Sequence, residues 1–160
     1  MDHITTIQSQ GNFGMSINIK KILNELDYLP SFDQQIGLQS VYGIEDPFYA
    51  TGKITDKKHK EEEFVEFCFD LPYTNQIIHD LGMYRTRVMR MNPKTCYTYH
   101  QDPTQRIHIP LVTNDKCFII LDKEVIHLPA DGNHYLIDTT KYHTAVNASH
   151  EVRTHIIGCI

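Results

Sequence analysis

Short runs of alternating hydrophobic and polar residues dominate the second half of the chain. Eight such runs follow one another between residues 84 and 160, separated by turn residues such as Asn92-Pro93 and Asn114-Asp115. The runs are YRTRVMRM, CYTYH, RIHIPLV, CFIIL, EVIHL, HYLID, HTAVN and VRTHIIGCI. Alternation with a period of two is typical of half-buried β-strands, and short regular spacing favours an antiparallel sandwich or barrel. The sequence therefore predicts a β core of about eight strands.

The first 83 residues are less regular and predict helices and extra strands that flank this core. The stretch INIKKILNELDYLP has apolar residues at helical spacing and ends at Pro30. PYTNQIIHDLG has Pro72 near its start and Gly82 at its end, which favours a second short helix. QIGLQSVY and FVEFCFDL are predicted to be strands, the first only weakly. The charge-dense tract KITDKKHKEEE, residues 53–63, predicts a solvated loop or a mobile lid. We expect residues 1–160 to form a single domain.

Composition narrows the class of protein. The chain has 160 residues, 41% of them hydrophobic and 22% charged, which is typical of a globular protein. A net charge of -5 and a pI near 6.0 argue against a nucleic-acid partner. No apolar run approaches the ~20 residues that cross a bilayer, and MDHITTIQSQ lacks the features of a signal peptide. Four scattered cysteines without CxxC spacing predict free, buried thiols, although one disulfide stays open. We expect a cytoplasmic protein with no membrane partner.

The stretch YHQDP places His100 and Asp102 two residues apart at the end of the second predicted core strand. With 10 His and 12 Asp in the chain, about 0.75 His-x-Asp pairs arise by chance, so position must decide. His143 begins the seventh strand, which can return beside the second in a two-sheet roll. Two His and one carboxylate leave three positions open on a metal, an arrangement suited to non-haem Fe(II). The alternative is a capped turn between two strands.

Arg153 follows His143 by ten residues and is predicted to lie well into the last strand, between Val152 and the pair Ile156-Ile157. An unpaired arginine would be costly in a half-buried strand, so an anionic partner is favoured over an edge-strand charge. A guanidinium there can pair bidentately with a dicarboxylate whose other end chelates the metal.

Other polar residues of the core strands depend on which sheet face is the interior. Arg106 and His108 alternate with isoleucines and share one face. If that face lies inside the roll, they meet a bound ligand; otherwise they are ordinary surface residues. The residues that could line a substrate mouth, but more often form sheet surface, are Arg85, Arg87, Arg90, Tyr97 and Tyr99. The remaining histidines are expected to be structural or surface residues.

The pattern His100, Asp102, His143 and Arg153 resembles that of the Fe(II)/2-oxoglutarate-dependent oxygenases. Within that superfamily the chain is most similar to the aspartyl/asparaginyl β-hydroxylase group. MNPKTCYTYH resembles a Met-His-Pro-x-Thr…His run, with Asn92 in place of the His. RIHIPLV resembles the strand that follows the first ligand, and YLIDTTKYHTAVN followed by Arg153 resembles a Phe-Asp-x-x-x-x-His…Arg segment. The resemblance covers residues 84–160.

The resemblance implies that His100, Asp102 and His143 bind Fe(II). It implies that Arg153 holds the distal carboxylate of 2-oxoglutarate and that Arg106 and His108 help to place this co-substrate. The sequence departs from the group in two ways. Asp102 is present although the best-studied animal members lack the acidic ligand, and Met89 stands where the group has a serine for the distal carboxylate. A second partner for that carboxylate is therefore unidentified.

The fold class implied is mostly β with flanking α, a double-stranded β-helix (a cupin-like jelly roll) with N-terminal helices against one sheet. Residues 1–83 would supply the helices and flanking strands, and residues 84–160 the jelly-roll core. The function implied is hydroxylation of an amino acid side chain, free or in a peptide or protein, with O2 as oxidant and release of succinate and CO2. The alternative is a cupin-like metal or small-molecule binding protein without oxygenase activity; a jelly-roll interaction or virion protein is a third. Arg153 favours the oxygenase, because a pure metal module has no use for a dicarboxylate partner.

Overall fold

The structure is a computed structural model that describes residues 4–7 and 16–160. The strands are β1 (Ile4–Ile7), β2 (Gln35–Gly37), β3 (Gln39–Ser40), β4 (Glu66–Phe67), β5 (Tyr84–Met91), β6 (Thr95–Cys96), β7 (Arg106–Val112), β8 (Cys117–Leu121), β9 (Glu124–Ile126), β10 (His134–Ile137), β11 (His143–Asn147) and β12 (Arg153–Cys159). The helices are α1 (Ile19–Leu26) and α2 (Pro72–Asp80), with 3-10 turns η1 (Pro47–Ala50), η2 (Ile54–Asp56) and η3 (Glu61–Glu63). Most of the N-terminal stretch that bears on the signal-peptide prediction lies outside the described residues.

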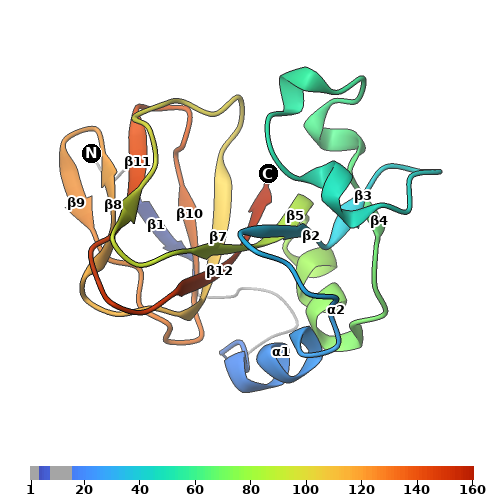
Figure 1. The fold of residues 1–160 in the computed structure, drawn as a ribbon, viewed down its shortest axis with the longest axis horizontal. Helices are drawn as coiled ribbons and strands as arrows, with labels where there is room; N and C mark the ends of the chain where they lie inside the picture. The colour runs from blue at the N-terminus through green and yellow to red at the C-terminus, as the bar shows by residue number, and fades with distance from the viewer. Residues whose placement is uncertain (1–3, 8–15) are drawn as a thin grey trace.

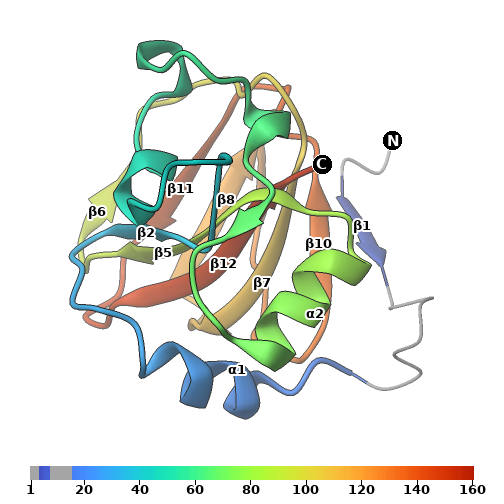
Figure 2. The same ribbon diagram turned by 90° about the vertical axis from the view of Figure 1, so that its right-hand side faces the viewer.

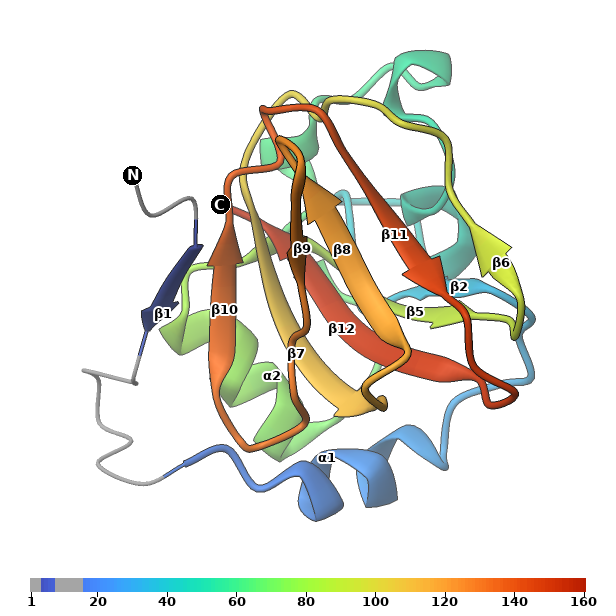
Figure 3. The ribbon, with the colours of Figure 1, turned by 90° about the vertical axis from the view of Figure 1, so that its left-hand side faces the viewer.

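Two antiparallel sheets form the body of the protein. The larger has six strands in the order β1-β10-β7-β12-β5-β2, and the smaller has four in the order β6-β11-β8-β9. Figure 3 shows β8, β9 and β11 of the four-stranded sheet lying over β7 and β12 of the six-stranded sheet. A third, two-stranded sheet joins β3 to β4 near the 3-10 turns (Figure 1). The prediction of a mostly β protein with flanking helices is confirmed.

The apolar core fills the outer face of the six-stranded sheet, where the two helices pack (Figure 2). Ile22 of α1 and Ile77 of α2 are buried with Ile107 and Ile109 of β7 and with Ile156 of β12. The helices are joined at their ends, because the carboxylate of Glu25 in α1 accepts hydrogen bonds from the first free N–H groups of α2. Such a cap satisfies donors that have no partner inside the helix.

The inner face of the same sheet is apolar at β10, where Tyr135 and Ile137 pack against β8, and carries buried charged and polar side chains along β7. Arg106 and His108 alternate with Ile107 and Ile109 along β7, so their side chains turn away from the helices and toward the four-stranded sheet. Both are buried, at 4% and 6% exposure. The alternation left the orientation of Arg106 and His108 open. The helices cover the opposite face of the sheet, so these two side chains point inward.

The element predictions hold best in the second half of the chain. Four predicted runs coincide with β5, β7, β8 and β11, and both predicted helices are present. The predicted strand 35–42 is split into β2 and β3, and FVEFCFDL contains only the two-residue β4. Arg153 is the first residue of β12, not a residue well inside it.

The charged tract 53–63 is mostly exposed, as predicted, but it is not a simple loop. It folds into η2 and η3, and Glu61 within it is 4% exposed. The four cysteines are free thiols, but only Cys117 and Cys159 are buried. In residues 4–7 and 16–160, neither helix has the length and apolar character needed to span a membrane.

Candidate metal and co-substrate site

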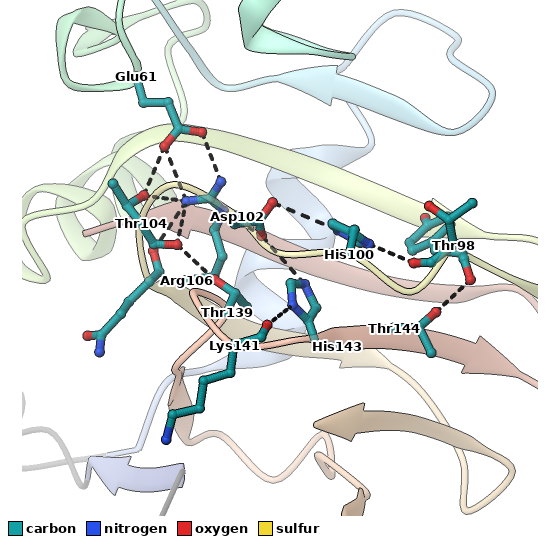
Figure 4. Close-up of polar contacts among 12 residues, drawn as sticks. Glu61, Thr98, His100, Asp102, Thr104, Arg106, Thr139, Lys141, His143 and Thr144 are labelled. Atoms are coloured by element: carbon teal, nitrogen blue, oxygen red, sulfur yellow. Dashed lines mark hydrogen bonds and ion pairs between the residues drawn. The ribbon is translucent and has the colours of Figure 1, made fainter. Parts of the chain in front are cut away.

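His100, Asp102 and His143 come together at one end of the two sheets. One ligand atom from each residue lies within 4.8 Å of the others, which makes this the candidate metal cluster of the described residues. His143 Nε2 is 3.5 Å from Asp102 Oδ2, and His100 Nε2 is 3.8 Å from Asp102 Oδ1. Figure 4 shows the three side chains converging, with His143 on β11 and with His100 and Asp102 on the segment between β6 and β7. The sequence prediction that these residues meet is confirmed, whereas their binding of metal stays a prediction.

Backbone pairing explains why residues 43 positions apart meet. His100 and His143 form an antiparallel bridge, in which each N–H donates to the other's carbonyl at 3.0 and 2.9 Å. The Asp102 N–H donates to the carbonyl of Thr139 at 2.8 Å, which holds the intervening turn against the segment before β11. On the other side of the bridge, the rings of Tyr99 and Tyr142 stack with centroids 5.5 Å apart. The ligand-bearing segments are thus fastened to each other on both sides.

The two histidines are oriented for metal binding through the same nitrogen. Nδ1 of His100 lies 2.7 Å from the Thr98 carbonyl, and Nδ1 of His143 lies 2.9 Å from the Lys141 carbonyl (Figure 4). A carbonyl only accepts, so each Nδ1 carries a proton, and in the neutral imidazole each Nε2 keeps a free lone pair. Burial also lowers the pKa of His143 below its ordinary value, which favours the neutral form. Metal-binding histidines are commonly fixed in this way by their second nitrogen, so the donor set fits a metal ion.

A buried network of ion pairs and hydrogen bonds holds the carboxylate of Asp102. Arg106 Nε lies 3.4 Å from Asp102 Oδ2, and Arg106 Nη2 donates to Glu61 at 2.8 Å. Arg85 Nη1 donates to the same Glu61 oxygen at 2.9 Å, and the Thr104 hydroxyl donates to the other oxygen at 2.9 Å. Burial alone would raise the pKa of Glu61, but Arg106, Thr104 and Arg85 together hold it below its ordinary value.

The guanidinium of Arg106 is fully engaged by this network. Its Nη1 also donates to Glu61 and to Thr104, so all three guanidinium nitrogens have protein acceptors. Its side chain lines the cavity, which is one of the two positions that the sequence left open, but its donors are already occupied. Arg106 is therefore placed to hold Asp102, and it reaches a bound ligand only by exchanging partners.

Arg153 has the opposite character. It is 2% exposed, and its Nε and Nη2 have no hydrogen-bond partner among the described residues. Burial lowers the pKa of its guanidinium, which shows that the charge is held at a cost. Arg153 lines the same cavity as the His-Asp-His cluster. An unpaired buried guanidinium facing a cavity fits the predicted anionic partner, whose binding stays a prediction.

His108, on the cavity wall, contacts a second buried histidine. Its Nδ1 lies 3.3 Å from Nδ1 of His155, with the rings edge to face. Burial lowers the pKa of both imidazoles well below the ordinary value. The pair is therefore neutral, with one Nδ1 donating a hydrogen bond to the other.

The three residues of the His-Asp-His cluster line a cavity of about 920 Å³ between the sheets, together with Arg106, His108 and Arg153. The sequence singled out these six residues, but Glu61 and Gln35 are among the wall residues that it missed. Glu61 was placed in a solvated tract, and Gln35 had no assigned role. His155, treated as structural, is not part of this wall and meets it only through His108. Arg87 and Tyr97, expected more often at the sheet surface, both line the cavity, whereas Arg90 packs over the ring of Phe32 at 3.9 Å. The alternation of Arg85 and Arg87 with Thr86 and Val88 could have shown that the two arginines share one face of the strand.

Comparison with known proteins agrees with this geometry. The model of the aspartyl/asparaginyl β-hydroxylase family matches residues 18–158. No protein of curated function is similar enough in sequence to count as a match.

Three solved structures align with this chain at low sequence identity. An oxidoreductase of the 2OG-Fe(II) oxygenase family from Burkholderia pseudomallei aligns with a TM-score of 0.57 and 14% identity, over 88% of this chain and 76% of that one. AviO1 from Streptomyces viridochromogenes aligns with a TM-score of 0.45 and 15% identity, over 88% and 82% of the two chains. The plu4264 protein from Photorhabdus luminescens aligns with a TM-score of 0.40 and 16% identity, over 46% of this chain and 58% of that one. The first of these shows a common fold, and the other two scores are too low to carry an argument.

Proposed function

The chain belongs to the aspartyl/asparaginyl β-hydroxylase family, and on this premise we propose that it is an Fe(II)- and 2-oxoglutarate-dependent dioxygenase. Its substrate is an amino acid side chain, free or in a peptide or protein, and its co-products are succinate and CO2. We further propose that the two main sheets are the halves of a double-stranded β-helix, with the site at one end of the roll.

A single observation carries the proposal: an unpaired buried guanidinium faces the same cavity as a His-Asp-His cluster. Arg153 has no carboxylate of the protein among the described residues to neutralise it, and the cluster supplies three ligand atoms within 4.8 Å of one another. A metal alone would use the cluster and leave Arg153 unsatisfied. A dicarboxylate that reaches both the metal and Arg153 satisfies both features.

Different residues bind the metal and the co-substrate. His100, Asp102 and His143 hold the metal, and Arg153 binds the distal carboxylate of 2-oxoglutarate. Bound Fe(II) and 2-oxoglutarate supply the oxidising chemistry with O2, in which 2-oxoglutarate becomes succinate and CO2 while a C–H bond is hydroxylated.

The surrounding residues position these groups. Arg106 and Glu61 keep the Asp102 carboxylate in place, and neutral His108 offers a ring nitrogen to the co-substrate from the cavity wall. A volume of about 920 Å³ is in the range of ligand pockets, so it accommodates the co-substrate with a small molecule or one side chain.

The test needs no substrate. Fe(II) and then 2-oxoglutarate are added anaerobically to the purified protein, and the visible charge-transfer band of the metal chelate is recorded. We expect the band in the wild type and in His79→Ala, a control whose side chain is 76% exposed. It is lost in His143→Ala. In Arg153→Met it requires about ten to a hundred times more 2-oxoglutarate, because one charge-assisted pair is removed.

Failure would take a definite form. A protein that binds Fe(II) through His143 but gives no band with 2-oxoglutarate is a cupin-like metal-binding protein. Loss of the band in His79→Ala to the same degree as in His143→Ala would remove the assignment of the metal to the cluster.

A further inference from the structure

The cavity is strongly cationic although the protein is acidic. Its charged lining consists of Lys53, Arg85, Arg87, Arg106, Arg153, Glu61 and Asp102. Five cations thus face two anions in a chain whose net charge is -5. The ligands of the proposed function leave this excess unchanged, because Fe(II) brings two positive charges and 2-oxoglutarate two negative ones. The excess of three positive charges therefore favours an anionic substrate over a neutral one.

Arg87 is the arginine that this anion would meet. It is 7% exposed, and its Nε has no partner among the described residues. Its Nη1 donates to the amide oxygen of Gln35 at 3.3 Å, which is a neutral acceptor and a long bond. Neither carboxylate of the cavity forms an ion pair with Arg87, because Glu61 is shared by Arg85 and Arg106, and Asp102 is paired with Arg106 and faces the two histidines. Burial, and then the neighbouring Arg85, lower the pKa of Arg87 to about 10.

The position of Arg87 separates it from the arginine assigned to 2-oxoglutarate. Arg87 of β5 pairs with Ile157 of β12, whereas Arg153 lies four residues earlier on β12. Four residues of a strand span about 13 Å, so the two guanidinium groups leave the sheet at different points of the cavity wall. One carboxylate of 2-oxoglutarate occupies Arg153 and the other belongs at the metal, which leaves Arg87 free.

We propose that Arg87, with the Gln35 amide beside it, anchors a carboxylate of the substrate. The inference rests on the proposed function and adds a substrate class: a small molecule or chain end with a free carboxylate. The fork of one guanidinium matches a planar carboxylate bidentately and supplies one compensating charge. A carboxylate held at Arg87 also orients the rest of the substrate within the cavity that the metal cluster lines.

The test measures binding without turnover. The protein is loaded anaerobically with Mn(II) and 2-oxoglutarate, and binding of L-proline, L-aspartate and L-asparagine is compared by calorimetry with that of their α-carboxamides. The variants are Arg87→Gln and Arg87→Lys. Arg90→Gln is the matched control, because Arg90 lies on the same strand, does not line the cavity and packs over Phe32.

We expect at least one carboxylate to bind the wild type and Arg90→Gln more tightly than its amide does. Arg87→Gln lowers the affinity for this carboxylate about tenfold to a hundredfold, and Arg87→Lys restores part of it, since charge returns without the bidentate fork. Affinity for 2-oxoglutarate stays within about twofold of wild type in Arg87→Gln. Thermal melting of the ligand-free variant shows no loss of stability, because a buried cation without a carboxylate partner has been removed.

Three results would overturn the inference. In the first, no carboxylate binds better than its amide; in the second, Arg87→Gln binds the carboxylate as well as wild type does. The third is a fall in 2-oxoglutarate affinity in Arg87→Gln, which would make Arg87 a co-substrate residue. Failure of the proposed function is distinct, because it is seen in the wild type as an absence of 2-oxoglutarate binding before any probe is added.

Discussion

Replacing Glu61 with glutamine is the sharpest test of the network behind Asp102. The Glu61 carboxylate is the shared acceptor of Arg85 and Arg106, with N–O distances of 2.9 and 2.8 Å and side chains only 4% to 5% exposed. The Glu61→Gln variant keeps the size of the side chain but removes the negative charge. Its amide N–H₂ also faces guanidinium donors that need an acceptor.

The expected cost follows from what is left behind. Breaking a buried ion pair by removing one partner costs about 3–5 kcal/mol, because the remaining charge is stranded. Here two guanidinium groups lose their common partner, although Arg85 keeps the Gly52 carbonyl at 2.7 Å and Arg106 keeps Asp102. We therefore expect a loss of about 3–5 kcal/mol in the free energy of unfolding, a large part of the roughly 5–15 kcal/mol of an ordinary domain.

The assay is urea denaturation at pH 7, followed by circular dichroism. Glu62→Gln is the control, because it removes the same charge from the exposed neighbouring residue. The double variant Glu61→Gln/Arg85→Met recovers part of the stability, since one stranded cation is gone. A loss below about 1 kcal/mol in Glu61→Gln, or equal losses in the two single variants, would refute this account of the network.

The network also predicts a dependence of stability on pH. The folded-state pKa of Glu61 is below its ordinary value of 4.5. The group therefore contributes stability that is fully present above about pH 4.5 and is lost as the pH falls through the folded-state value. The difference in the free energy of unfolding between wild type and Glu61→Gln, measured from pH 7 downward, isolates this contribution. A difference that grows as the pH falls would contradict the sign of the shift.

Three further predictions concern the rest of the site. Arg153→Met raises the unfolding free energy of the ligand-free protein by about 1–3 kcal/mol, because two N–H groups without partners are removed; a lower melting temperature without ligand would contradict this. The folded-state pKa values of His108 and His155 lie well below 6.5. The free energy of unfolding therefore falls as the pH drops below about 6.5, by up to about 1.4 kcal/mol per pH unit for each histidine. A urea midpoint that stays constant from pH 7.5 to 5.5 would be inconsistent with two neutral imidazoles. Gly158→Ala costs about 1–3 kcal/mol in urea denaturation, because the new Cβ would lie 2.5 Å from Met83 Cε and 3.0 Å from Met83 Cβ; an unchanged midpoint would mean that Met83 moves aside freely.

The sequence by itself determined the strands of the second half and the identity of the candidate ligands. Period-two alternation is a local property, so the boundaries of β5, β7, β8 and β11 could be read from it. The meeting of His100, Asp102 and His143 could be predicted because a roll brings their two segments together. The predicted strand CYTYH is absent, however: β6 covers only Thr95–Cys96, and His100 pairs with His143 through an isolated bridge. Arg153 stood out because a charged residue among buried neighbours needs a partner.

Only the tertiary structure decided which face of each strand is the interior and which charges lie inside it. The helices cover the isoleucine face of β7, and this turns Arg106 and His108 toward the cavity. The same packing places Arg87 on the cavity wall and buries Glu61, although the tract around Glu61 reads as solvated. The physical reason is that alternation sorts the side chains of a strand onto two faces but does not show which face is buried. Whether a charge can be buried depends, in addition, on partners that are distant in sequence. Glu61 meets Arg85 and Arg106 from 24 and 45 residues away, a pairing that no local pattern contains.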